Sequence, residues 1–158
     1  MRPPDAVFVE PLTIAEILVR CGLASLCGFI IGLDREIRDM PAGLRTHMLV
    51  CLGAAALAII TSQMYLELRR GGTEDLTADP LRVIEATVAA IGFLGAGAMF
   101  RQGGTIAGMT TAANIWLAGV VGLACGAGYF AMASILTAFT VAILTLLYFV
   151  KRILGKGD

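Results

Sequence analysis

Apolar residues fill most of this chain in five long stretches, which are separated by short loops that carry most of the charges. Each stretch is close to the roughly 20 residues that a helix needs to cross a bilayer. Because lipid cannot satisfy exposed backbone groups, we expect every stretch to be a helix. The predicted spans cover residues 12–33, 48–66, 83–100, 105–125 and 129–150, the fourth of which could become apolar only near Met109. The pattern predicts an all-α integral membrane protein with five transmembrane helices, formed by residues 1–158 as one domain.

Composition supports a membrane protein and excludes some partners. Hydrophobic residues make up 58% of the chain and charged residues 15%, whereas about a quarter of an ordinary soluble domain is charged. The formal net charge of +0 gives no support to a nucleic-acid partner. The four cysteines lie inside predicted spans without metal-ligand spacing, so we expect free thiols that fill space: Cys21, Cys27, Cys51 and Cys125.

The charges in the loops predict the orientation of the spans. The loops after the first and third spans, together with the tail, hold seven basic residues: Arg35, Arg38, Arg45, Arg101, Lys151, Arg152 and Lys156. The other side holds four: Arg2, Arg69, Arg70 and Arg82. Since the more basic side stays in the cytoplasm, we expect the N-terminus outside and the C-terminus in the cytoplasm.

Small residues recur at helical spacing in several spans. Gly28 and Gly32 lie one turn apart in the first span, a spacing that lets two helix backbones approach closely. The third span holds Gly92, Gly95 and Gly97 within six residues, which is denser than packing needs. Because each glycine weakens a helix by about 1 kcal/mol relative to alanine in water, this span could be kinked or locally unwound, as in discontinuous transporter helices.

Two motifs go beyond hydropathy. One is GLDREIRDMPAGLRTH at residues 32–47, and the other is IGFLGAG at residues 91–97, followed by RQGG at 101–104 and GMTTAA at 108–113. With these motifs the chain resembles the membrane domain of the MgtC/SapB family of bacterial inner-membrane proteins, over residues 12–150. The resemblance implies five spans with an outside N-terminus, and an association with growth at low magnesium and with virulence, through survival inside host cells. It implies no settled activity, because magnesium transport and regulation of other membrane proteins are competing views.

The chain departs from the family pattern in three places. Many relatives continue into a soluble C-terminal domain, whereas this sequence stops at Asp158, so we expect functions of that domain to be absent. Ala90 stands where relatives often have glycine, and Asn114 where they often have threonine. Glu85 is an unusual acid near the outer end of the third span. The intramembrane polar site could therefore differ from that of the family.

Four polar residues within the predicted spans are candidates for function: Glu16, Arg20, Glu85 and Asn114. Arg20 lies about 12 Å into the first span, where an arginine costs at least about 2.5–3.5 kcal/mol. It could form a neutral pair with Glu16, four residues earlier, and reach outward. It could instead face the bundle interior and pair with Glu85 or an anion. Asn114 could form a hydrogen bond between helices, and Glu85 could be solvated at the interface.

The cytoplasmic loop motif supplies eight further candidates: Asp34, Arg35, Glu36, Arg38, Gly43, Arg45, Thr46 and His47. Alternating signs are typical of a solvated face of neutralised pairs. The alternative is a docking or cation-sensing surface in which Asp34 and Glu36 bind Mg²⁺, although the nearby arginines would repel a divalent ion. We expect Thr46 to be the N-cap of the second span and His47 to be interfacial.

Two functions fit these residues. The first is a non-catalytic protein of the bacterial inner membrane that takes part in magnesium homeostasis by binding and modulating other membrane proteins. The alternative is a transporter or channel for Mg²⁺ or another small ion, which Arg20, Glu85, Asn114 and the glycine-dense span favour. No acid lies at the midplane of a span, although a homo-oligomer could build a ring from single residues. We expect no enzyme, because catalytic sets and metal-ligand spacings are absent from the sequence, and no cofactor unless the loop takes Mg²⁺.

Overall fold

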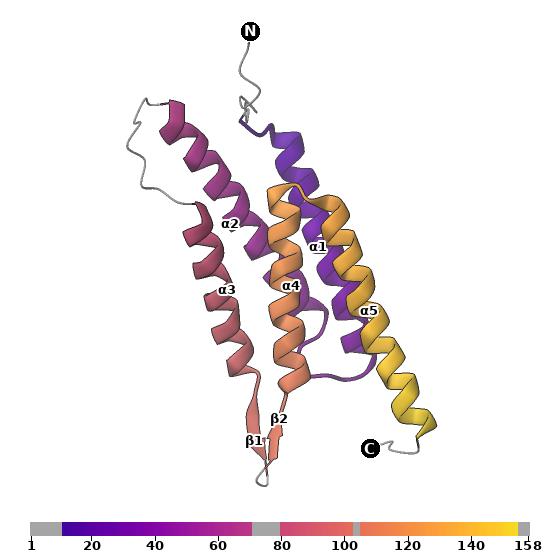
Figure 1. The fold of residues 1–158 in the computed structure, drawn as a ribbon. Coiled ribbons are helices and arrows are strands. Elements are labelled where there is room, and N and C mark those ends of the chain that lie inside the picture. Colours follow the sequence, from indigo (N-terminus) through magenta and orange to yellow (C-terminus); the bar gives the residue numbers. More distant parts are fainter. Residues whose placement is uncertain (1–10, 71–79, 103–104, 155–158) are drawn as a thin grey trace.

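The computed structural model describes residues 11–70, 80–102 and 105–154, which form five helices and one short β-hairpin (Figure 1). In chain order the elements are α1 (Ile14–Ile37), α2 (Leu44–Arg70), α3 (Pro80–Gly97), β1 (Phe100–Gln102), β2 (Thr105–Ala107), α4 (Met109–Ala127) and α5 (Phe130–Ile153). The helices lie side by side as one elongated bundle. Helix α4 packs between α2, α3, α1 and α5.

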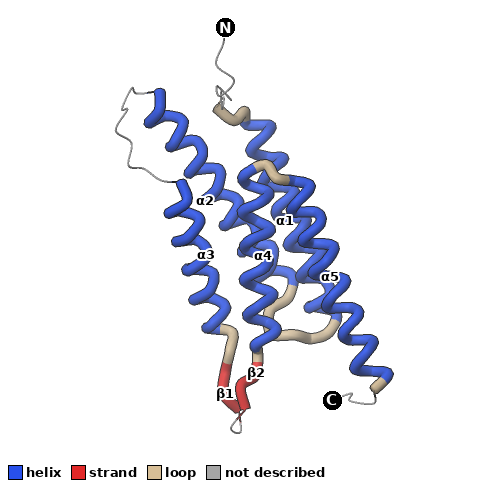
Figure 2. The backbone as a smooth tube through the Cα atoms, viewed as in Figure 1, coloured by secondary structure: helices blue, strands red, loops and turns tan. Residues whose placement is uncertain are grey.

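The bundle has two distinct ends. At the hairpin end, α1 and α3 finish and α2 and α4 begin, and the two strands project beyond the helices (Figure 2). At the opposite end, α1 begins and a short turn joins α4 to α5. A capping box opens α1 there, in which Thr13 accepts a hydrogen bond from the Glu16 backbone and Glu16 accepts one from the Thr13 backbone.

Four helices are long and apolar enough to cross a membrane: Ile14–Ile37, Leu44–Leu68, Met109–Ala127 and Phe130–Val150. The chain is therefore an all-α, multi-pass membrane protein that contacts lipid. Helix α3 covers most of the third predicted span. Over its described residues, it is not one of the four helices that are long and apolar enough to cross a membrane. In an 18-residue stretch of each span, 61% of the residues are buried in Met109–Ala127 and 17–22% in the others, so α4 is the central helix.

The connection between α3 and α4 differs from the sequence prediction. Residues 100–102 and 105–107 pair as antiparallel strands, with Arg101 opposite Ile106 and Gln102 opposite Thr105. The third predicted span therefore ends too late, because apolar residues such as Phe100 suit a short strand as well as a helix. Helix α4 begins at Met109, the later of the two starts considered for the fourth span. The chain enters α4 through Gly108, whose φ of 86° favours glycine.

Small residues bring the backbones of three helices together, as their spacing predicts. A Cβ added to Gly28 of α1 would lie 2.6 Å from the His47 carbonyl oxygen of α2. On α4, a Cβ at Gly122 would overlap the backbone of α2 at Cys51. The buried core beside these contacts is made of small, sulfur-containing and β-branched residues: Ala24, Cys27, Ile31, Cys51, Ala55, Ala118, Val121, Ala124, Cys125 and Ala133. All four cysteines are free thiols.

The glycines of α3 behave differently from those of α1 and α4. The helix is continuous through Gly92 and Gly95 and ends at Gly97, so the unwinding considered for this span is not present. A Cβ at Gly95 would lie 3.1 Å from the Ala112 carbonyl oxygen, which places this glycine against α4. Added Cβ atoms at Gly92 and Gly97 would meet nothing within 4 Å. Two of the three glycines are therefore not needed for packing within this chain.

Candidate functional site

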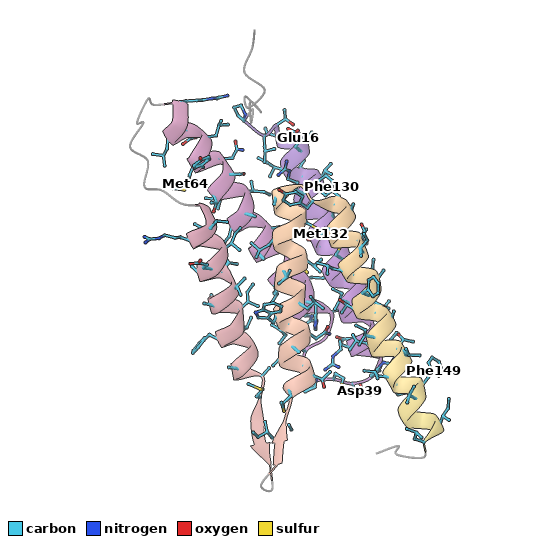
Figure 3. The ribbon with its side chains drawn as sticks, viewed as in Figure 1. Glu16, Asp39, Met64, Phe130, Met132 and Phe149 are labelled. Carbon is cyan, nitrogen blue, oxygen red and sulfur yellow. The ribbon has the colours of Figure 1, made fainter. Side chains whose placement is uncertain are left out.

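The loop motif folds into a compact polar cluster at the hairpin end, and its first part terminates α1. The Asp39 N–H donates to the Glu36 carbonyl at 3.2 Å, and the Met40 N–H donates to the Arg35 carbonyl at 3.0 Å. These two bonds form a Schellman motif, with Asp39 in the left-handed conformation at φ 51°. Figure 3 shows Asp39 at this end of the bundle, far from Glu16 at the other. The motif thus reverses the chain between α1 and α2.

The start of α2 is capped by a side chain from α1. Glu36 Oε2 accepts a hydrogen bond from the Leu44 backbone N–H at 3.0 Å, and its negative charge suits a helix N-terminus. Gly43 makes this possible, because any Cβ there would overlap the Glu36 carboxylate. The prediction that Thr46 is the N-cap was wrong, since α2 begins at Leu44 and Thr46 lies within its first turn. Sequence reasoning missed this cap because its acceptor belongs to another helix.

A second group of motif residues joins α1 to α5. Arg38 donates to Asp34 Oδ1 from Nη2 at 2.6 Å and from Nε at 3.0 Å. The Arg38 guanidinium also lies over the Tyr148 ring, 4.0 Å from its centroid, which is a cation–π contact. Thr145 donates to the same Asp34 oxygen at 3.5 Å. This part of the motif is a docking surface for the protein's own fifth helix.

Arg35 points into the bundle instead of into solvent. It is 2% exposed, and its Nη2 donates to Thr111 Oγ1 of α4 at 2.6 Å. Thr111 is not among the site residues predicted from the sequence. Its spacing could have indicated it, because Thr111 precedes Asn114 by three residues and so lies on the same face of α4.

His47 and Asn114 form the second buried contact of the cluster. The His47 Nδ1 lies 2.8 Å from the Gly43 carbonyl oxygen, and its Nε2 lies 3.1 Å from Asn114 Nδ2. A carbonyl only accepts, so Nδ1 carries the proton, and Nε2 then accepts from the Asn114 amide. These contacts assign a neutral His47. His47 is buried among the helices at 0% exposed, and the predicted helix-to-helix role of Asn114 is confirmed by its contact with His47.

Arg20 lies at the other end of α1 and contacts the end of α4. Its Nη1 donates to the Gly126 carbonyl oxygen at 2.6 Å, which suits a cation at a helix C-terminus. The Glu16–Arg20 pair considered from the sequence is not formed, because Glu16 is engaged in the capping box of α1. Glu85 is exposed. The ion pair found within the described residues is Arg38–Asp34, so Arg20 does not pair with Glu85. Arg20 does face the bundle, as the second alternative had it.

The remaining motif residues do not join the buried cluster. Arg45 is exposed on the first turn of α2. Asp34 and Glu36, the candidate magnesium ligands, already accept hydrogen bonds from Arg38 and from the Leu44 backbone. Within the part of the chain that the structure describes, three or more His, Cys, Asp or Glu side chains do not gather at any point. The arrangement can therefore hold helices in register and keep a buried cation.

Comparison with known proteins identifies the family. The MgtC family model matches residues 21–153, which is most of the chain. The chain belongs to the MgtC family. Protein MgtC of Brucella abortus (strain 2308) is 39% identical to it over 124 residues, 78% of this chain and 48% of the relative. Protein SapB of Bacillus subtilis (strain 168) is 35% identical over 132 residues, 82% of this chain and 54% of the relative.

The name of a third relative mentions magnesium. The protein YhiD of Escherichia coli (strain K12), whose name describes it as a proposed magnesium transporter, is 34% identical over 116 residues, 73% of this chain and 53% of the relative. The chain thus spans about half the length of the curated relatives that it matches. No solved structure matches it significantly. The matched MgtC region contains both halves of the buried cluster, Arg35 with Thr111 and His47 with Asn114.

Proposed function

We propose that this MgtC-family chain is a non-catalytic protein of the bacterial inner membrane that binds and modulates other membrane proteins when magnesium is scarce. In this proposal all five helices cross the membrane, with the N-terminus outside and the hairpin end in the cytoplasm. The excess of basic residues in the loops on that side supports the orientation. A modulator needs a surface within the membrane that a second protein can cover, and α3 offers one.

The observation that carries the proposal is a face of α3 that the other described residues leave uncovered. Ala86, Ala90, Phe93 and Gly97 lie on one side of the helix, at spacings of four, three and four residues. All four are exposed, and Phe93 is 84% exposed. We call these four residues the free face of α3. Helix α3 packs against α4 and α2, and these four exposed residues are not buried by that packing.

The chemistry of the free face suits another transmembrane helix. Between helices in lipid the hydrophobic drive is absent, and association depends on close packing at small residues. Gly97 and the alanines would let a partner backbone approach, and Phe93 would fill a gap between the partner's side chains. Gly28 of α1 and Gly122 of α4 already serve close approach inside this chain, whereas Gly97 has open space in which to do the same for a partner.

The test uses a bacterial strain whose growth at micromolar Mg²⁺ depends on a plasmid copy of this chain. Gly97→Leu should block close approach at the free face and abolish growth at low Mg²⁺. Gly22→Leu is the matched control, because an added Cβ at Gly22 of α1 also meets nothing within 4 Å, and this variant should grow normally. Both variants should be equally abundant in the membrane and melt at similar temperatures. Normal growth with Gly97→Leu, or equal loss in both variants, would contradict the proposal.

Transport of Mg²⁺ or another small ion is the second candidate, and the name of the Escherichia coli relative favours it. The two candidates differ in purified liposomes, where a transporter needs no partner. We expect no Mg²⁺ flux above that of empty vesicles from the folded, inserted chain. A saturable flux that Arg20→Leu and Glu85→Gln both remove would instead support the transporter and place its pathway along α1 and α3.

A further inference from the structure

Arg35 is a buried cation that lacks an anionic partner. Its side chain reaches the first turn of α4, where Nη2 donates to the neutral hydroxyl of Thr111. Its Nε is buried and has no hydrogen-bond partner. Among residues 11–70, 80–102 and 105–154, the ion pair is Arg38–Asp34, so no carboxylate oxygen of these residues lies within 4.0 Å of Arg35. Buried charges in proteins are normally paired, which makes this arginine unusual.

The Arg35 guanidinium lies at the N-terminus of α4, where a positive charge is unfavourable. Thr111 is the third residue of α4, and the N-terminus of a helix carries the positive end of the helix dipole. The first turn of α4 has no acidic residue, and its N-cap, Gly108, makes no side-chain capping hydrogen bond. The first N–H groups of a helix have no partner within it. A positive side chain and the positive end of a 19-residue helix therefore meet without a neutralising group.

The charged groups nearby do not remove this excess. Asp34 and Arg38 both act on the Arg35 charge, and with opposite signs. These two residues form an ion pair with each other, in which Arg38 holds one oxygen of Asp34. His47 also interacts with the Arg35 charge, and the hydrogen bonds to Gly43 and Asn114 assign it as neutral. Among the described residues, the Arg35 charge is therefore left without an ion-pair partner.

We propose that Arg35 and the first turn of α4 form a binding site for a phosphate group, supplied by a lipid headgroup or by free inorganic phosphate. A guanidinium offers a planar fork of donors that matches phosphate oxygens. The N–H groups at a helix N-terminus bind the same anion. Arg35 lies two residues from the end of α1, about 3 Å along the helix. Its own side chain is buried, whereas Met109 and Thr110 in the first turn of α4 are exposed, so a phosphate group would approach the site from that turn.

Inorganic phosphate is tested on the purified chain in a neutral maltoside detergent, with chloride replacing phosphate at constant ionic strength. Phosphate should raise the unfolding temperature of the wild type. In Arg35→Gln, its apparent affinity should fall by about tenfold or more, the size expected for hydrogen bonds to a charged group. Arg45→Gln removes the same charge from an exposed position at the same end, and its affinity should stay within about twofold of the wild type.

Lipid headgroups are tested by native mass spectrometry of the same proteins with added phosphatidylglycerol. If a headgroup fills the site, the wild type and Arg45→Gln should retain one lipid more than Arg35→Gln does. If inorganic phosphate fills it, the number of bound lipids should be equal and only the unfolding temperatures should separate the variants. The proposal is overturned if Arg35→Gln matches the wild type in both assays, or if Arg45→Gln loses as much as Arg35→Gln.

A substitution on α4 keeps the test decisive if Arg35→Gln fails to fold. Thr111→Asp would put a carboxylate beside Arg35, in the first turn of α4, and so supply the missing anion from within the chain. Thr111→Asn has nearly the same shape without the charge. Thr111→Asp should melt above Thr111→Asn in phosphate-free detergent, and its response to phosphate should be lost. The proposal would be contradicted if Thr111→Asp melted below Thr111→Asn, or if phosphate still raised the unfolding temperature of Thr111→Asp as it does that of the wild type.

Discussion

Arg20 and Arg35, fifteen residues apart on α1, contact the two ends of α4: Arg20 bonds to Gly126 and Arg35 to Thr111, which are also fifteen residues apart. The two helices run antiparallel in matching register over about 22 Å. The electrostatic energies of the two contacts with the α4 dipole differ in sign, because a cation is favourable at the C-terminus of a helix and unfavourable at its N-terminus. Arg20 therefore stabilises the α1–α4 pair, whereas Arg35 needs an anion to do so.

The first prediction concerns Arg20. Arg20→Met keeps much of the apolar stem and removes the hydrogen bond to the Gly126 carbonyl, so the free energy of unfolding should fall by about 1.5–3 kcal/mol. Equilibrium unfolding in mixed SDS micelles measures this change. Arg45→Met is the control, because Arg45 is exposed at the N-terminus of α2, and it should be neutral or slightly stabilising. Equal losses in the two variants would contradict the capping role of Arg20.

The second prediction concerns the pairing of His47 with Asn114. A double-mutant cycle of His47→Leu and Asn114→Leu should give a coupling free energy of about 0.6–1.7 kcal/mol, the range for hydrogen bonds between membrane helices. Asn114→Leu and Thr140→Val form the control cycle. Thr140 is equally buried, but its hydroxyl bonds within α5, so these two changes should be additive. Coupling of the same size in both cycles would mean that the contact is not specific.

The third prediction compares two glycines. In Gly122→Ala the new methyl would overlap the α2 backbone at Cys51, so the free energy of unfolding should fall by about 1–3 kcal/mol. In Gly53→Ala the methyl meets nothing within 4 Å, and the variant should be stabilised by up to about 1 kcal/mol through helix propensity. In the same unfolding assay, the two changes in the free energy of unfolding should have opposite signs. An unchanged free energy of unfolding in Gly122→Ala would contradict the close approach of α4 to α2.

The fourth prediction concerns the turn after α1. Asp39 adopts a φ of 51°, which costs an L-residue roughly 1 kcal/mol and glycine almost nothing. Asp39→Gly should therefore raise the free energy of unfolding by about 0.5–1 kcal/mol, and the β-branched Asp39→Val should lower it. A thermal melt of the two variants beside the wild type checks this order. The reverse order would mean that the Asp39 side chain stabilises the turn by another route.

The length of the apolar stretches was enough to predict the helices, because lipid leaves the backbone no alternative. The spacing of Gly28 and Gly32 also predicted a helix contact, since two missing side chains on one face leave room for a backbone. The sequence could not say which helix would fill that room. The end of the predicted third span was wrong at residue 100, because residues 100–102 and 105–107 pair as strands. The later start considered for the fourth span, near Met109, is confirmed.

The polar residues were harder to predict, because each had a local and a distant partner in competition. The four-residue spacing favoured a Glu16–Arg20 pair, but Thr13 engages Glu16, and the α4 carbonyls bind Arg20. Thr46 looked like a helix cap by residue type, and a carboxylate from α1 took that role. Propensity rules describe neighbours along the chain, whereas these bonds join residues brought together only by the folded bundle.

The central place of α4 has a consequence for the order of assembly. Helices α1 and α2 emerge first during synthesis and pack extensively on each other. Helix α3 follows, yet it shares more contact with α4 than with α2, so it is made before the helix that mainly holds it. Until α4 inserts, the surface of α3 that will contact α4 is uncovered. If assembly stopped after α3 inserted and before α4 did, the bundle would be incomplete and open to any neighbouring helix that can take the place of α4.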